Sequence, residues 1–458
     1  MSEESIFDTA RWQARLDALR VTHNVPGASL AVLADGAVHE LASGVLHLGT
    51  GVRVTPDSVF QSGSVAKVYT ATLVMRLVDE GLLDLDATVA DVLPEFATPD
   101  PAATRAITVR RLLSHTGGVT NDFTYDSGRG DDCLARYVEA ARDVPLDCAP
   151  GTAFSYGSLG YVVLGRVIET LTGRTWDRAL KDLLFDPLGL ERSMTLPEEA
   201  LRHRVAMSHL DGAPAPRWDL MPRSAGPYAR VLVSSGDMVR FARMHLDGGV
   251  APDGTPVLSG GAVAAMQGPE TDVPDKWTVG SDAWGLGWTL YDWDGVKGCG
   301  HDGAAIGQYS FLRVVPGAGV AVALMTNGGA ARPLCADLFR ELLGEFAAIT
   351  MPAPFGPAAD PPAVDVTPFL GTYRREGVVI TVTRNDDGTA HMVYEFVDGM
   401  KDMSPPLDMD LEPVTGNVFA ASGAGASFAE DYMTVVFHTL ADGTPVCYAG
   451  MRATPKVA

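Results

Sequence analysis

The sequence is poor in the features that mark secreted, membrane-spanning and nucleic-acid-binding proteins. Its five cysteines are scattered and include no Cys-x-x-Cys pair, which favours free thiols over a disulfide framework and provides no zinc-ligand spacing. No apolar run reaches the ~20 residues that a bilayer-spanning helix needs. Lys and Arg total 35 against 57 Asp and Glu, with no basic run, so phosphates and anionic lipid surfaces are poor partners. We expect no nucleic acid, membrane, metal ion or cofactor.

The first residues also lack a targeting signal. Residues 1–8 have neither the positive start nor the apolar stretch of a secretory signal, so we expect a cytoplasmic protein. Hydrophobic residues make up 46% of the 458 residues and charged residues 20%, which is an ordinary globular composition. At roughly 150 residues per domain, this length corresponds to about three domain-sized units.

Residues 1–349 read as an α+β body. Strand-like runs occur near both of its ends, at 27–33, 38–42, 309–315 and 320–325. The part from about 64 to 260 is mainly helical, and two of its helices, 65–80 and 159–172, are apolar nearly all round and therefore buried. This order predicts one antiparallel sheet flanked by helices, with a helical insertion.

The last part of the chain has a different pattern. Residues 350–368 contain six prolines and read as a semi-rigid linker. Residues 369–458 contain no convincing helix, and short strands are predicted at 378–383, 390–396, 433–439 and 446–451. Evenly spaced short strands predict a small closed barrel or sandwich.

Ser64-Val65-Ala66-Lys67 is the only Ser-x-x-Lys sequence in the chain. On a helix this spacing places the hydroxyl and the amine on one face. A serine is a poor nucleophile until a neighbouring base takes its proton, and a neutral lysine can act as that base. The start of a helix also stabilises a developing oxyanion. The alternative is a capping serine and a lysine that reaches solvent from an apolar helix.

Two further segments carry candidate acid/base groups. Tyr156 lies in the loop 150–158, which enters the second buried helix, and a tyrosine beside a lysine can pass a proton to a leaving group. The alternative is a packed tyrosine followed by Ser158 as N-cap. His301 lies between Gly300 and the Asp302-Gly303-Ala304 sequence, and such glycines let a ligand approach the backbone. A lone histidine is, alternatively, structural.

Together these segments resemble the serine β-lactamase and penicillin-binding-protein superfamily, and most closely its class-C-like branch of esterases, D-aminopeptidases and acyltransferases. Three other stretches carry the likeness: Leu112-Leu113-Ser114-His115-Thr116-Gly117-Gly118, Asp186-Pro187-Leu188-Gly189-Leu190 and Gly285-Leu286-Gly287-Trp288. The resemblance covers residues 6 to about 347. It implies a roughly five-stranded antiparallel sheet and a helical domain, with the site in the cleft between them.

The resemblance also implies roles for single residues. Ser64 becomes the nucleophile, Lys67 its base and Tyr156 a second acid/base. His301 takes the first position of the Lys-Thr-Gly-type strand motif. The remaining implied roles are an oxyanion hole from the backbone N–H groups of Ser64 and Ala304 and substrate contacts from Ser158, Asp302 and Gly303. Ser158 replaces the asparagine of the Tyr-x-Asn motif, and a hydroxyl lacks an amide's paired donor and acceptor.

The tail, which opens Phe369-Leu370-Gly371-Thr372-Tyr373, resembles the lipocalin-like barrel appended to some members. With this tail, the whole chain resembles stand-alone penicillin-binding-protein-type thioesterases, which release and macrocyclise nonribosomal peptides. The resemblance therefore implies a small peptide or acyl substrate and, as a partner, an acyl- or peptidyl-carrier protein. The motifs do not separate such a cyclase from an esterase or a D-stereospecific peptidase with the same tail.

Two other functions fit the sequence less well than acyl-enzyme chemistry. A catalytically dead binding module would be expected to lack one of the chemical residues, yet Ser64, Lys67 and Tyr156 are all present. An α/β-hydrolase would need Gly-x-Ser-x-Gly at an elbow, and neither Ser64 nor Ser158 has that context.

The formal net charge of the chain is −22 at pH 7, and this charge leads to two expectations. A carboxylate beside Lys67 would hold its proton, so we expect an apolar or cationic pocket around Ser64. An acidic carrier would need a basic docking patch, with these candidates: Arg223, Arg230, Arg240 and Arg243. The alternative for these arginines is an ordinary solvated face. We also expect the barrel to roof the cleft.

Overall fold

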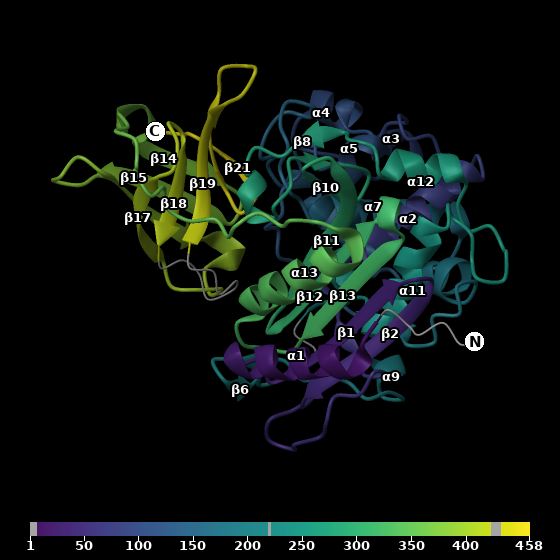
Figure 1. Ribbon diagram of the computed structural model, residues 1–458. Coiled ribbons are helices and arrows are strands. Elements are labelled where there is room, and N and C mark those ends of the chain that lie inside the picture. Colours follow the sequence, from purple (N-terminus) through teal and green to yellow (C-terminus); the bar gives the residue numbers. More distant parts are fainter. Residues whose placement is uncertain (1–6, 219–220, 423–431) are drawn as a thin grey trace.

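The computed structural model describes residues 7–218, 221–422 and 432–458. Two β structures lie beside each other, a large sheet within an α+β body and a separate barrel made by the end of the chain (Figure 1). The α+β class and the barrel predicted from the sequence are both confirmed. None of the helices in the described ranges combines the length and hydropathy needed to cross a membrane.

The body is built on an eight-stranded antiparallel sheet, where the resemblance implied about five strands. The strands, in spatial order, are β2 (Ala37–Gly44), β1 (Gly27–Ala34), β13 (Val320–Thr326), β12 (Gln308–Val315), β11 (Val296–Ala305), β10 (Thr289–Trp293), β9 (Ala283–Trp284) and β8 (Thr271–Asp272). The added strands are β10 and the two-residue β9 and β8. The predicted hairpin between β1 and β2 is present, with Ala34 opposite Ala37 across the turn.

Helices cover both faces of this sheet, so its central strands are buried on both sides. Helices α1 (Thr9–Thr22) and α13 (Ala331–Ala347) pack on one face, where Leu30 of β1 joins their apolar cluster. Residue Ala31 of the same strand faces the opposite cluster, as the two-residue period of a strand requires. Helix α11 (Ser235–Leu246) contacts the sheet on this second face.

The helical insertion forms the largest apolar cluster. Its helices besides α11 are α2 (Ala66–Asp79), α3 (Val89–Val92), α4 (Pro101–Ala106), α5 (Val109–Leu113), α6 (Cys133–Ala140), α7 (Leu159–Thr172), α8 (Trp176–Leu180), α9 (Pro197–Ala200), α10 (Gly226–Ala229) and α12 (Gly260–Met266). Two small sheets accompany them: β3 (Phe60–Gln61), β7 (Leu232–Val233) and β4 (Ser193–Met194), and β5 (His209–Leu210) with β6 (Ala213–Pro214). Helices α2 and α7 are buried as expected, and α7 ends at Gly173, whose φ of 66° is left-handed.

The tail forms an eight-stranded antiparallel barrel. Its strands are β14 (Gly371–Arg375), β15 (Val378–Arg384), β16 (Ala390–Phe396), β17 (Leu407–Pro413), β18 (Val418–Ser422), β19 (Tyr432–Thr439), β20 (Pro445–Ala449) and β21 (Arg452–Pro455). A bridge between Tyr373 and Lys456 links the first strand to the end of the last. The predicted strand at 446–451 ends earlier, at Ala449, because Gly450 and Met451 form a turn with φ of 61° and 70°.

Two turns of the barrel contact the body. The β14–β15 turn packs on the segment after α5, where a Cβ on Gly377 would lie 3.1 Å from the Cβ of Asp122. The β20–β21 turn reaches the loop before α7, where the N–H of Tyr156 donates to the carbonyl of Met451 at 3.0 Å. These contacts bring the barrel to the residues that the sequence singled out.

Candidate active site

Ser64 and Lys67 lie side by side at the start of α2. Ser64 belongs to the 3₁₀ turn Gly63–Val65, and Lys67 is the second residue of α2. Lys67 Nζ lies 3.3 Å from Ser64 Oγ and donates to the carbonyl of Tyr228 at 3.2 Å. The spacing therefore brings the two side chains together, and α10 holds the amine from the other side.

The surroundings of Lys67 favour an uncharged amine. The side chain is fully buried, and Nζ lies 4.6 Å from the ring centre of Tyr156, 5.7 Å from that of Tyr161 and 5.2 Å from that of Tyr228. Burial and the positive charge of Arg452 lower the pKa of Lys67 well below its usual 10.5. Within the described ranges no carboxylate pairs with it, so the expected apolar and cationic pocket is present.

Tyr156 is a buried phenol beside this pair. Burial raises its pKa to about 12, while the nearby Ser64 hydroxyl and Arg452 oppose the rise. The phenol is therefore neutral at neutral pH. Its hydroxyl makes no hydrogen bond of normal geometry to the residues described but lies close to Ser64, so it is placed to exchange a proton with a ligand bound there.

His301 lies on β11 as a neutral imidazole. Burial and the proximity of Lys67 lower its pKa to about 3. Its Nδ1 lies 2.6 Å from the carbonyl oxygen of Asp302, which can only accept, so Nδ1 carries the proton and Nε2 is an acceptor. The ring packs edge-on against Trp284, 5.4 Å between centres. In place of the lysine that the family motif has, this position offers a hydrogen-bond acceptor.

The backbone of β11 packs directly on the turn that carries Ser64. A Cβ on Gly63 would lie 2.5 Å from the N of Ala304, and one on Gly303 would lie 2.0 Å from the carbonyl oxygen of Ser62. Both glycines are needed for this contact, which brings the backbone of Ser64 and Ala304 to the same cleft. The arrangement suits the predicted oxyanion hole. Gly303 thus has a packing role in addition to its place at the cleft.

Asp302 lines the cleft, but its carboxylate is already paired. It is bound by Arg313 and lies 3.8 Å from Arg332. Burial alone would raise the pKa of Asp302, yet the charge and hydrogen bond of Arg313 and the charge of Arg332 together outweigh burial and lower it. The predicted substrate contact therefore has to come from the backbone of Asp302 or from a ligand that displaces an arginine.

Ser158 is the N-cap residue of α7, but its side chain makes no capping hydrogen bond. Its Oγ instead donates to Asn121 Oδ1 at 2.8 Å. Asn121 was not predicted as a site residue, because it lies 37 positions away and belongs to no motif. Two other residues were also missed as site residues, Trp284 and Arg452, although Trp284 directly precedes the quoted 285–288 stretch.

The candidate site is a cleft of ≈ 430 Å³ between the body and the barrel. The body supplies Ser64, Tyr156, Ser158, His301 and Ala304 to its lining. The barrel supplies an apolar, methionine-rich rim and one cation: Met400, Met403, Met433, Gly450, Met451 and Arg452. Asp275 of the body holds the roof in place, because its Oδ2 accepts from the N–H of Met451 at 2.8 Å. Barrel residues therefore line one side of the cleft, and their effect on hydrolysis against transfer stays a prediction.

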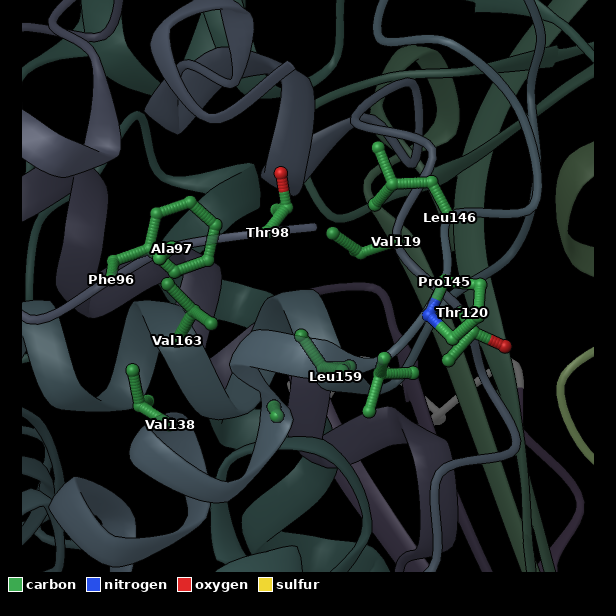
Figure 2. A pocket seen from close by; sticks show the side chains of 12 residues that line it. Phe96, Ala97, Thr98, Val119, Thr120, Val138, Pro145, Leu146, Leu159 and Val163 are labelled. Carbon is green, nitrogen blue, oxygen red and sulfur yellow. The ribbon is translucent and has the colours of Figure 1, made fainter. Parts of the chain in front are cut away.

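A second hollow lies among the helices of the body (Figure 2). Phe96, Val163 and other apolar side chains line it, and the polar side chains there are Thr98 and Thr120. Its volume of ≈ 10 Å³ is about that of one probe sphere for water, so it is a packing gap. Within the described residues, no group of three or more His, Cys, Asp or Glu side chains is placed to hold a metal ion.

Comparison with known proteins gives the family and the fold of the chain. The β-lactamase family profile matches residues 12–344. Penicillin-binding protein 4 of Amycolatopsis lactamdurans is 64% identical over 376 residues, which are 81% of this chain and 99% of that protein. The crystal structure of SurE with D-Leu is 31% identical, with a TM-score of 0.77 over 98% of this chain and 99% of SurE.

A third match concerns the fold alone. D-amino acid amidase from Ochrobactrum anthropi SV3, complexed with L-phenylalanine amide, is 22% identical, with a TM-score of 0.62 over 75% of this chain and 99% of that one. The SurE match, at 98% of this chain, extends through the barrel. The chain belongs to the superfamily of β-lactamase-like serine hydrolases and penicillin-binding proteins.

Proposed function

We propose that the protein is a serine acyl-enzyme hydrolase or acyltransferase that acts on peptide-type esters, thioesters or amides. The observation that carries the proposal is the buried Lys67 amine, 3.3 Å from Ser64 Oγ and without a carboxylate partner in the described part of the chain. A neutral amine in this position can accept the Ser64 proton as Oγ attacks the substrate carbonyl.

The remaining groups fit the later steps. The N–H groups of Ser64 and Ala304 would stabilise the oxyanion of the tetrahedral intermediate. As the bond to the leaving group breaks, that group takes a proton from the Tyr156 hydroxyl, which the protonated Lys67 can restore. In the second half-reaction, water or an amine attacks the carbonyl carbon of the acyl-enzyme. The attacking group loses a proton to Tyr156 and Lys67, and these residues return a proton to Ser64 Oγ as its bond to the acyl group breaks.

Among such enzymes, we propose a stand-alone thioesterase that releases and macrocyclises nonribosomal peptides. Two observations support it: the match to SurE with D-Leu runs through the barrel, and the barrel rim places methionines over the cleft. A roofed, apolar cleft disfavours water and favours an amine held next to the acyl group. Methionine adapts to apolar groups of varied shape, as the side chains of a folded-back peptide require. The D-Leu of SurE leads us to propose a D-configured residue in the substrate.

A carrier protein is proposed as the donor of the peptidyl thioester, but four arginines considered as its docking patch do not form a free basic surface. Three of them pair with carboxylates and the fourth is buried: Arg223 with Asp131 and Asp177, Arg240 with Glu40 and Asp237, Arg243 with Asp247, and Arg230 at 4% exposure. A carrier would have to use another surface.

Intact-mass spectrometry with synthetic peptidyl thioesters ending in D- or L-residues tests the proposal. We expect the mass of the wild-type protein to rise by one acyl group, Ser64→Ala to show no adduct, and a cyclic product to follow with the D-terminated peptide. Free acid as the sole product would favour the alternative, an esterase or D-stereospecific peptidase. Absence of an adduct with every activated ester would overturn acyl-enzyme chemistry at Ser64.

A further inference from the structure

The cleft contains the amide side chain of Asn121 next to Ser158, the position at which the family motif has an asparagine. Ser158 stands where the Tyr-x-Asn motif has asparagine, and a serine hydroxyl cannot offer both a donor and an acceptor in one plane. Asn121, from the segment after α5, lines the same cleft and accepts a hydrogen bond from Ser158 Oγ at 2.8 Å. The amide function is thus present but comes from another part of the chain.

The orientation of the Asn121 amide is fixed by its neighbours. Its Nδ2 donates to Asp122 Oδ1 at 2.7 Å, and Asp122 is ion-paired with Arg375. An ionised carboxylate only accepts, so the atom of Asn121 that faces Asp122 has to be the NH₂ group. The atom that faces Ser158 is then the carbonyl oxygen, in agreement with a donating hydroxyl.

After these two contacts Asn121 still has binding capacity. One N–H of Nδ2 and one lone pair of Oδ1 are unused by the described partners, because an amide has two donors and two acceptor sites. The side chain is partly exposed in a cleft that also contains Ser64 and Tyr156. A secondary amide of a substrate matches the remaining pair, with its N–H toward Oδ1 and its carbonyl toward Nδ2.

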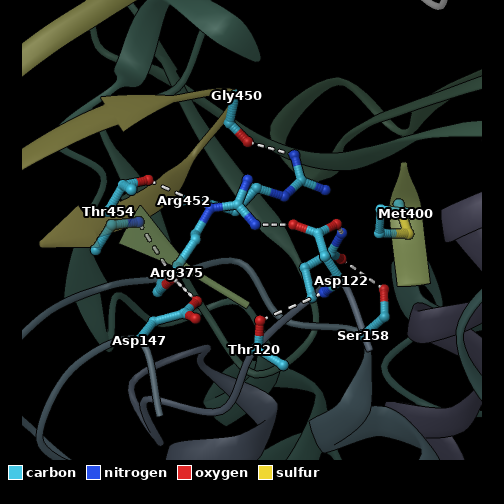
Figure 3. A network of polar contacts seen from close by, with 12 residues as sticks. Thr120, Asp122, Asp147, Ser158, Arg375, Met400, Gly450, Arg452 and Thr454 are labelled. Atoms are coloured by element: carbon cyan, nitrogen blue, oxygen red, sulfur yellow. Dashed lines mark hydrogen bonds and ion pairs between the residues drawn. The ribbon is translucent and has the colours of Figure 1, made fainter. Parts of the chain in front are cut away.

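The barrel supplies the residue that holds this arrangement. Arg375 of β14 is 6% exposed and donates to the Tyr394 hydroxyl at 2.9 Å and to Thr454 Oγ1 at 3.3 Å within the barrel. Its guanidinium also pairs with Asp122 of the body (Figure 3). Removing one member of a buried ion pair leaves the other uncompensated, so the two charges fix each other's position.

We infer that Asn121 binds a backbone amide of the acyl donor, and that Arg375 is a positioning residue that orients Asn121 through Asp122. The inference rests on the proposed function and narrows its substrate class to acyl donors that carry a secondary amide next to the reacting carbonyl, as peptidyl groups do. It also gives the barrel a part in substrate recognition besides covering the cleft.

Kinetics with two matched thioesters test the role of Asn121. One is an N-acyl-D-leucyl thioester, and the other is its isostere in which CH₂ replaces the amide N–H. We expect Asn121→Ala to lower kcat/KM for the amide substrate by about 10-fold, the size of one to two hydrogen bonds between neutral groups, and to leave the isostere nearly unchanged. An equal loss with both substrates, or no loss with either, would overturn the inference.

Matched variants separate recognition from folding. Ser158→Ala leaves the contact of Asn121 with Asp122 intact and should cost less than Asn121→Ala. The exchange Asn121→Ser with Ser158→Asn should restore part of the preference for the amide substrate. Asn385→Ala, in a barrel turn away from the cleft lining, is the control expected to leave both rates unchanged. Thermal melting of each variant shows whether the fold is kept.

The role of Arg375 is tested through Asp122. Asp122→Asn can donate as well as accept, so it no longer fixes which atom of Asn121 faces it, and the ratio of the two kcat/KM values should fall. Arg375→Lys keeps the charge and serves as the conservative variant, with a smaller fall expected. An unchanged ratio in a folded Asp122→Asn variant would overturn the positioning role. If the wild-type protein forms an adduct with the isostere, the proposed acyl-enzyme function stands whatever the ratio of the two kcat/KM values. If neither thioester gives an adduct, both the proposed function and the inference about Asn121 are overturned.

Discussion

The guanidinium carbon of Arg452 lies 5.1 Å from the ring centre of Tyr156, so the barrel places a permanent cation beside the candidate acid/base of the body. Arg452 begins β21 and directly follows Met451, whose carbonyl accepts from the N–H of Tyr156. The positive charge helps to lower the pKa of Lys67 and opposes the rise in the pKa of Tyr156. The barrel therefore contributes to the electrostatics of the cleft as well as to its walls.

Arg452→Met should move the acid limb of the pH–rate profile to higher pH. A general base has to be neutral, and removing a nearby cation makes protonation of Lys67 easier, so its pKa rises. The rate of acyl-enzyme formation, measured from about pH 5 to about pH 10, reports that pKa. Arg374→Met, at a barrel arginine paired with Asp398, is the control. An unshifted acid limb would contradict the electrostatic role of Arg452.

Lys67→Met should slow acylation by about 10²- to 10⁴-fold, the usual contribution of a general base. The methionine keeps an apolar stem of similar length among the rings of Tyr156, Tyr161 and Tyr228, so the fold should remain. Its cost in stability is the lost hydrogen bond to the Tyr228 carbonyl. Stopped-flow acylation together with thermal melting checks both parts. Near wild-type acylation in this variant would remove Lys67 from the mechanism.

Local patterns in the sequence predict the parts of the site that lie on one helix or one strand. The Ser-x-x-Lys spacing places Ser64 beside Lys67, and apolar periodicity predicts α2 and α7 with ends that agree with the structure to within about one residue. The order of strands and helices also predicts the α+β body, because the spacing of apolar residues within each segment shows whether that segment is a helix or a strand.

The contacts between distant segments could not be predicted in this way. Asp122 and Arg375 are 253 positions apart, and no local pattern indicates that the two residues meet. The roof depends on Met451, which the sequence placed inside a strand, whereas its φ of 70° makes it part of a turn. Strand β17, in contrast, was missed although Leu407, Met409 and Leu411 alternate with acidic residues, a period-two signal sufficient to predict it.

Gly303→Ala should reduce kcat by roughly 10²-fold, in line with the loss of an oxyanion-hole donor. The added Cβ would lie 2.0 Å from the carbonyl oxygen of Ser62, and this is backbone that cannot rotate away. β11 must therefore shift away from the turn that carries Ser64, and the N–H of Ala304 moves with it. Gly317→Ala is a matched control in a turn that follows β12, where an added Cβ meets no atom within 4 Å. Equal activity of the two variants would contradict the packing role of Gly303.

Asp147→Asn should remove a pH dependence of stability that arises between the body and the barrel. Asp147 Oδ2 accepts from Ser155 Oγ at 2.8 Å, and Ser155 Oγ accepts from the N–H of Ala453 at 3.2 Å. Burial raises the pKa of Asp147 from 3.8 to about 7. The folded state therefore binds this proton more tightly than the unfolded chain, and stability falls as pH rises from 3.8 toward 7.

The test of this prediction is the free energy of unfolding by urea, measured for the wild type and Asp147→Asn at several pH values between 3.8 and about 7. The difference between wild type and Asp147→Asn should change with pH by at most about 1.36 kcal/mol per unit, in favour of the variant at the higher pH. Asp386→Asn, at an exposed barrel turn, is the matched control substitution. Other titrating groups contribute equally to both proteins. Parallel curves for Asp147→Asn would therefore mean that Asp147 has the same pKa in the folded protein as in the unfolded chain, which would contradict the rise in pKa caused by burial.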